Sequence, residues 1–311
     1  MKQNIRRILD PAALSLLVAA YYASVWMAPA PAVKAAFVKG LGATLTMLAC
    51  CTLLYFIYQH LLSGSSSVAA LLYAVLAAAH PAALYFSPFH IGVLLMALCM
   101  YCYLHFNADT PSEEYLFIAW AAFSAACLFL PPLAWLMPVL LLSSLIRTTG
   151  KRRFLMISLL GMLLPLAVWT GIRFLLNDPA PIGFLSDMGS QMTTLQLPHF
   201  NQPVVGIVRI AMTAVVTLTA ICCILPWMSH FRTAEYRACV RLILLTVCLA
   251  AVAVLFLSDP GTPACMLVML PVAPLLSRFL ECHPRGRLAP LLFTVLALLL
   301  AAGRIALFVN P

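Results

Sequence analysis

Residues 154–176 read FLMISLLGMLLPLAVWTGIRFLL, and they directly follow the basic loop 147–153. The only charged residue in this run is Arg173, close to its end. The hydrocarbon core of a bilayer is about 30 Å thick, and a helix needs about 20 apolar residues to cross it. The run therefore predicts a membrane-spanning helix that begins beside a cluster of positive charge.

The rest of the chain has the same apolar character. Hydrophobic residues make up 64% and charged residues 9% of the 311 residues, whereas about 25% of a soluble globular protein is charged. The mean hydropathy of +1.03 leaves no stretch for a soluble domain. We therefore predict an integral membrane protein with a single transmembrane helical domain over residues 1–311.

The net charge of +9, from 18 Lys and Arg against 9 Asp and Glu, does not indicate a nucleic-acid partner. The basic residues are scattered between apolar runs, where such residues set topology and anchor the chain to lipid headgroups. The predicted partner is the lipid bilayer.

Apolar runs of this kind recur along the chain and predict an all-α, polytopic fold with about eleven membrane segments. They lack the two-residue alternation of a membrane β-strand. The runs lie at about 11–29, 36–59, 67–86, 89–106, 115–131, 133–146, 154–176, 204–228, 242–257, 264–280 and 288–308.

Charges at the segment ends orient the chain. Lys2, Arg6 and Arg7 precede the first run, and short positively charged loops stay in the cytoplasm. Threading eleven segments from an inner N-terminus places the later basic clusters inside as well, and the C-terminus outside. These clusters are Arg147 with Lys151, Arg152 and Arg153, then Arg232, Arg237 and Arg241, then Arg278, Arg285 and Arg287.

Two places in this topology stay open. Pro131 and Pro132 divide the run 115–146, and the charge rule favours a hairpin that returns to the cytoplasm over one kinked span. The hairpin is either two full spans or a re-entrant pair. The first segment also has features of a signal peptide, with small residues around prolines at 28–32, and its cleavage would leave the rest of the topology unchanged.

The outward connection at about 177–203 is the best candidate for a site. It contains Asp178, Asp187 and His199 but no Lys or Arg, and Arg173 and Arg209 flank it. Two arginines at headgroup level are suited to binding a phosphate or carboxylate. The alternative is structural, because the arginines can also reach lipid headgroups or pair with the two aspartates. The mixture of apolar and polar residues in the loop predicts a short helix on the membrane surface.

Sequence motifs indicate no further catalytic or metal-binding site. Cys99 and Cys102 have the spacing of a metal or redox pair, but no second pair accompanies them, and most of the 11 cysteines lie in apolar runs, as free thiols do. Tyr101 and His105, one helical turn apart, are predicted to form an interior polar pair. The common hydrolase, metalloprotease and phosphate-loop motifs are absent from the sequence. Catalytic residues therefore stay unknown, and we predict no metal and no cofactor.

A series of features over about residues 69–176 carries a family resemblance. His80-Pro81 closes one run, Ser87-Pro88 opens the next, and Leu130-Pro131-Pro132 is followed by the basic loop 147–153. In this order they resemble an uncharacterised family of multi-pass inner-membrane proteins from Bacteroidetes. The resemblance implies a bacterial cytoplasmic (inner) membrane location and no known activity.

A more distant resemblance concerns the proline pair with the Leu-rich run from Leu133. This pattern is similar to multi-span glycosyltransferases that use polyprenyl-phosphate sugars. Such enzymes imply an acidic residue in the first outward loop, but residues 28–40 contain Lys34 and Lys39 and no acid.

Three functions remain open from the sequence. The first is a non-enzymatic inner-membrane protein, structural or accessory to cell-envelope assembly. The second is a carrier for a lipid-linked or small anionic substrate. The third is a membrane-embedded transferase acting on polyprenyl-phosphate substrates, with Arg173 and Arg209 holding phosphate and Asp178 or Asp187 as base.

Overall fold

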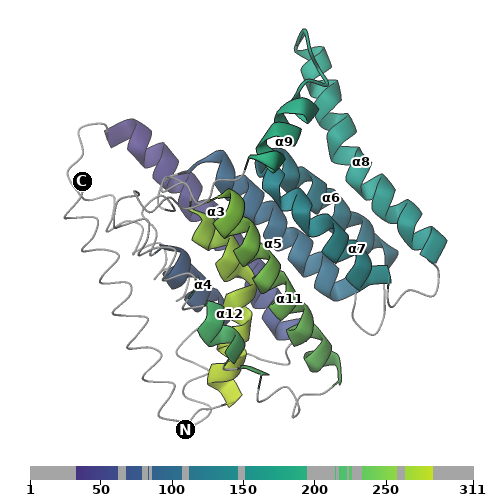
Figure 1. The fold of residues 1–311 in the computed structure, drawn as a ribbon. Helices are drawn as coiled ribbons and strands as arrows, with labels where there is room; N and C mark the ends of the chain where they lie inside the picture. Colours follow the sequence, from purple (N-terminus) through teal and green to yellow (C-terminus); the bar gives the residue numbers. More distant parts are fainter. Residues whose placement is uncertain are drawn as a thin grey trace.

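The computed structural model describes residues 33–61, 68–78, 83, 86–106, 112–145, 151–194, 214, 217–222, 224, 225, 233–257 and 263–282. Within these ranges the secondary structure is helical and contains no strand, as the sequence predicts. Figure 1 shows the arrangement of the helices. They are α3 (Val33–Leu61), α4 (Val68–Ala78), α5 (Pro88–Phe106), α6 (Glu113–Phe129), the 3-10 helix η2 (Pro131–Leu136), α7 (Met137–Leu145), α8 (Lys151–Leu175), α9 (Phe184–Thr193), α11 (Thr233–Phe256) and α12 (Ala264–Cys282).

Four of these helices contain a stretch long and apolar enough to cross a membrane. The stretches are Gly40–Ile57, Pro88–Phe106, Arg152–Leu175 and Tyr236–Phe256. Shorter apolar helices occupy other predicted runs, among them Ala264–Phe279. The predicted runs 11–29 and 288–308, and most of 204–228, lie outside the described residues. The chain is thus an apolar helical membrane protein, and the number of eleven segments stays a prediction.

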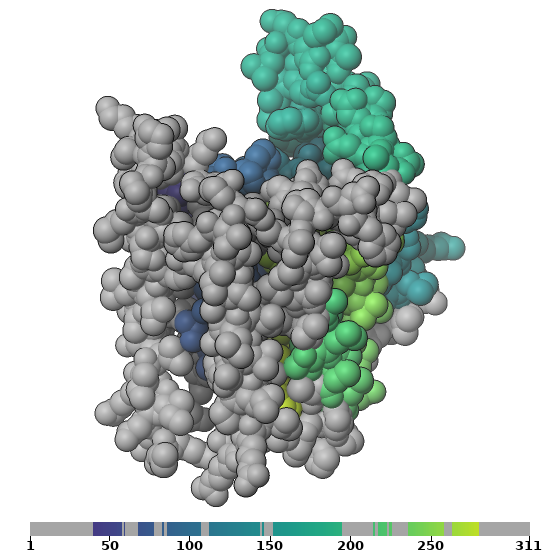
Figure 2. Space-filling view, turned by 60° about the vertical axis from the view of Figure 1, so that its left-hand side comes forward, coloured from purple at the N-terminus to yellow at the C-terminus, as the bar shows by residue number. Residues whose placement is uncertain are grey.

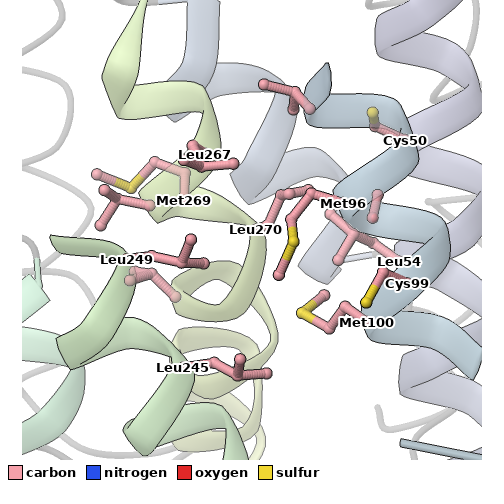
Figure 3. Packing of buried hydrophobic residues seen from close by; sticks show 14 of the residues in the cluster. Cys50, Leu54, Met96, Cys99, Met100, Leu245, Leu249, Leu267, Met269 and Leu270 are labelled. Atoms are coloured by element: carbon pink, nitrogen blue, oxygen red, sulfur yellow. The ribbon is translucent and has the colours of Figure 1, made fainter. Parts of the chain in front are cut away.

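The core is built around α12, whose residues 266–277 are all buried. It packs against α4 and α11, and Figure 3 shows Leu270 of α12 between Leu249 of α11 and Met96 of α5. Pro271 and Pro274 lie inside this helix, which a helix buried among others tolerates because its neighbours fill the distorted turns. Because lipid tails are as apolar as these side chains, close packing rather than water exclusion holds the core together.

The proline pair ends α6 and reverses the chain. Leu130 has a non-helical backbone (φ −135°, ψ 76°), and Pro131 and Pro132 open η2. After the turn, α7 runs back along the bundle. This is shown by the hydrogen bond between the Ser143 hydroxyl near the end of α7 and the Tyr103 hydroxyl near the end of α5. The chain therefore reverses direction at the proline pair, and the side of the membrane to which it returns stays a prediction.

The start of α8 lies at the same end of the bundle as the start of α6. Arg153 Nη2 donates to Glu113 Oε2 at 2.7 Å, and the Phe154 ring lies 6.0 Å from that of Phe106, the last residue of α5. Both α6 and α8 run away from this end, so they are parallel neighbours with α7 between them in sequence.

Only the first half of α8 is packed on the bundle. A Cβ on Gly161 would lie 2.7 Å from the carbonyl oxygen of Phe117, and the Ser124 hydroxyl donates to the carbonyl of Met162 at 2.6 Å. Beyond this contact, none of the residues 163–176 is buried. In Figures 1 and 2 the second half of α8 and the attached α9 project from the rest of the molecule.

Candidate functional site

The second half of α8 ends in a defined C-terminal motif. Asn177 adopts a left-handed backbone conformation with φ 56°. The N–H of Asp178 donates to the carbonyl of Arg173, and the N–H of Asn177 donates to that of Phe174, each at 3.0 Å. This pair of bonds is a Schellman motif, in which asparagine is one of the few residues that accepts the left-handed position. Pro179 follows and prevents the helix from continuing.

This motif brings the carboxylate of Asp178 back to Arg173. Arg173 Nε donates to Asp178 Oδ2 at 2.6 Å, and the backbone N–H of Ala180 donates to Asp178 Oδ1 at 3.0 Å. The pKa of Asp178 lies below its ordinary value, first because of the Ala180 N–H bond and further because of the Arg173 guanidinium. Asp178 therefore stays ionised at neutral pH.

The first residue of α9 completes the corner. The Arg173 guanidinium carbon lies 5.8 Å from the centre of the Phe184 ring, a cation–π distance. Phe184 is buried, whereas most other residues of α9 are exposed. We call Arg173, Asp178, Ala180 and Phe184 the α8–α9 corner.

The other end of α9 is attached to η2. The Trp135 indole N–H donates to the carbonyl of Met192 at 3.1 Å, and Met188 packs against the core. The Trp135 ring also stacks on Phe256 of α11, with centroids 6.1 Å apart. The helix α9 therefore connects the projecting end of α8 to η2, directly after the proline turn.

Comparison with known proteins identifies the family. A family of unknown function, DUF6427, matches residues 12–304. The chain belongs to this family. No curated protein and no solved structure matches it.

The residues predicted for a site in this DUF6427 protein are only partly brought together. Arg173 and Asp178 form an ion pair. Asp187 lies exposed on α9 and makes no ion pair with any residue in the described ranges. Arg209 and His199 lie outside the described residues.

Phe184 and Trp135 belong to the site but were not predicted from the sequence. The sequence does not single out either residue, because their contacts with Arg173 and Met192 form only in the folded chain. The run Asn177-Asp178-Pro179 does carry a signal, since asparagine followed closely by proline is typical of a helix end.

Two histidines of this family member, His90 and His105, contact neighbouring groups inside the helical bundle. His90 is fully buried at the start of α5, where Nε2 lies 3.0 Å from the carbonyl of Ala83 and Nδ1 lies 3.2 Å from the Ser87 hydroxyl. The His105 ring stacks on Tyr115 at 5.3 Å and meets Tyr101 edge-on at 4.4 Å. The predicted pair of Tyr101 and His105 is thus a three-ring cluster between α5 and α6.

None of the cysteine side chains that the structure describes forms a disulfide. Cys99 and Cys102 are both buried in α5. Across those ranges no group of three His, Cys, Asp or Glu side chains is placed to hold a metal ion.

Proposed function

We propose that this DUF6427 protein is a non-enzymatic, multi-pass component of the bacterial cytoplasmic membrane, with a structural or accessory role in the cell envelope. The observation that carries the proposal is the ion pair of Arg173 and Asp178. Arg173 and Asp178, two of the residues predicted for a substrate site, instead bond to each other where the end of α8 meets the start of α9.

The hydrogen bonds and the lowered pKa of Asp178 favour this proposal over an enzymatic function. Both of its oxygens accept hydrogen bonds from the corner, and its pKa is lowered. A general base at neutral pH works best with a pKa raised toward 7, so the shift has the wrong direction for the base of a polyprenyl-phosphate transferase. A carrier for a lipid-linked or small anionic substrate is the other alternative.

The experiment replaces the charged pair with a neutral one. In Arg173→Met with Asp178→Asn, the methionine keeps a flexible side chain beside the Phe184 ring, and the asparagine keeps an oxygen for the Ala180 N–H. The double variant is expressed in a strain that lacks the native gene, and envelope integrity is scored by sensitivity to detergent and antibiotics.

We expect the deletion to weaken the envelope and the double variant to restore it. The matched control is Arg153→Met with Glu113→Gln, which neutralises the ion pair at the other end of α8. A double variant that inserts and unfolds like the wild type but fails to restore the envelope would show that the charges of the corner handle a substrate. A deletion strain with an intact envelope would contradict the envelope role.

A further inference from the structure

We propose that the α8–α9 corner binds the phosphate of an anionic membrane phospholipid through the terminal nitrogens of Arg173. The inference goes beyond the proposed function and does not rest on it, because it concerns lipid retention rather than envelope assembly.

The first step is the incomplete use of the Arg173 guanidinium. An arginine side chain has five N–H donors in a planar fork, and Asp178 receives one of them, from Nε. Among the residues that the structure describes, the two terminal nitrogens of Arg173 have no acceptor. The Arg173 side chain is 27% exposed, and its terminal nitrogens are not among the buried unpartnered atoms, so they are open to a ligand from outside the chain. An external oxygen ligand fits here.

The second step is the depth of Arg173 in the membrane. Arg153 and Arg173 lie on the same helix, and the spacing between them corresponds to a rise of about 30 Å at 1.5 Å per residue. This distance matches the thickness of the hydrocarbon core. When Arg153 lies at one headgroup layer, Arg173 lies at the opposite one, at the level of lipid phosphates.

The third step is the apolar surface around the corner. Phe174, Leu175 and Leu176 are 71%, 80% and 74% exposed. Ile182 and Leu185, close to Phe184 in sequence, are also exposed. Large apolar side chains exposed to this degree need an apolar cover, and acyl chains attached to a phosphate provide the cover and the oxygen ligand together.

The same features favour a lipid over a free anion. Among the described residues, Arg173 is the one cation of the corner, and the carboxylate of Asp178 lies beside it. A free phosphate would gain one cation and face one anion. A phospholipid gains the same bidentate hydrogen bonds and in addition the apolar contacts.

The experiment uses two variants that break the same ion pair. Arg173→Ala removes the guanidinium, whereas Asp178→Asn leaves it in place and frees its Nε–H. Arg153→Ala is the control for loss of an arginine at the opposite end of α8. Each full-length protein is purified in detergent and titrated with phosphatidylglycerol, and bound lipid is counted by native mass spectrometry.

We expect Arg173→Ala to weaken phosphatidylglycerol binding roughly tenfold, the effect of about 1.4 kcal/mol of lost charged hydrogen bonding. Asp178→Asn should bind at least as tightly as the wild type, and Arg153→Ala should match the wild type. Equal losses in Arg173→Ala and Asp178→Asn would overturn the proposal, since the broken corner alone would then explain them.

A competition distinguishes the two sources of phosphate. Inorganic phosphate added to the wild type should leave the bound phosphatidylglycerol in place, because it offers no acyl chains. Displacement of the lipid by inorganic phosphate would overturn the assignment to a phospholipid.

Discussion

The two halves of α8 are alike in composition but differ in what surrounds them. Gly161 in the first half is so close to α6 that an added Cβ would lie 2.7 Å from a backbone oxygen of Phe117. Around Gly171 in the second half, the described part of the chain places no atom within 4 Å of the same added atom. One half is therefore positioned by close helix packing, and the other by its own C-terminal motif and by α9.

The difference shows how a membrane helix can be fixed at one end and project at the other. Small residues let helices approach closely in a bilayer, where packing rather than hydrophobicity drives association. Gly161 and Ser124 provide this contact in the first half of α8. In the second half, the ion pair of Arg173 and Asp178 shapes the end without attaching it to the bundle.

The largest expected effect comes from adding one methyl group at each glycine. Gly161→Ala should destabilise the protein by about 1–3 kcal/mol, because the new Cβ meets backbone rather than a flexible side chain. Gly171→Ala should be neutral or slightly stabilising, because alanine has a higher helix propensity than glycine. Thermal unfolding of the purified protein in detergent measures both. Equal effects at the two positions would contradict the division of α8 into a packed and a projecting half.

A smaller effect is expected at the hydrogen bond between α6 and α8. Ser124→Ala removes the hydroxyl that donates to the Met162 carbonyl at 2.6 Å, and such bonds in membrane proteins contribute about 0.6 kcal/mol on average. Thr170→Ala is the matched control, because its hydroxyl bonds within α8, to the Leu166 carbonyl. A larger loss for Thr170→Ala than for Ser124→Ala would show that α8 depends more on its own turns than on α6.

Within the described residues, the sequence predicts the helices well and their partners poorly. The run 154–176 differs little from the observed span of α8, because about 20 apolar residues are recognisable without knowledge of the fold. The sequence also places Arg173 and Asp178 five residues apart, so their ion pair is one of the predicted alternatives. The contact of Gly161 with α6 was not predictable, because lipid-facing and protein-facing surfaces are equally apolar. The hydrogen bond from Trp135 to Met192 joins residues far apart in sequence, and no periodicity encodes it.

The corner itself should respond to pH. The pKa of Asp178 is lowered in the folded protein, so the stability that its carboxylate contributes is present above the unfolded value of about 3.9 and is lost as the pH falls through the folded pKa. Asp178→Asn lacks this contribution at every pH. The difference in melting temperature between wild type and variant should therefore be constant above about pH 5 and should close below about pH 4. A difference that grows on acidification would contradict the lowered pKa.

The smallest effect is expected at the ion pair that joins the starts of α8 and α6. The side chains of Arg153 and Glu113 are 75% and 48% exposed, and many exposed pairs of this kind contribute nothing measurable. Arg153→Ala should lower the melting temperature slightly, and the loss should shrink in 1 M salt, where the screening length is about 3 Å. A large loss that salt reduces would mean that charge positions the first half of α8. A small, screened loss beside a large one for Gly161→Ala would assign that role to the close contact of Gly161 with α6.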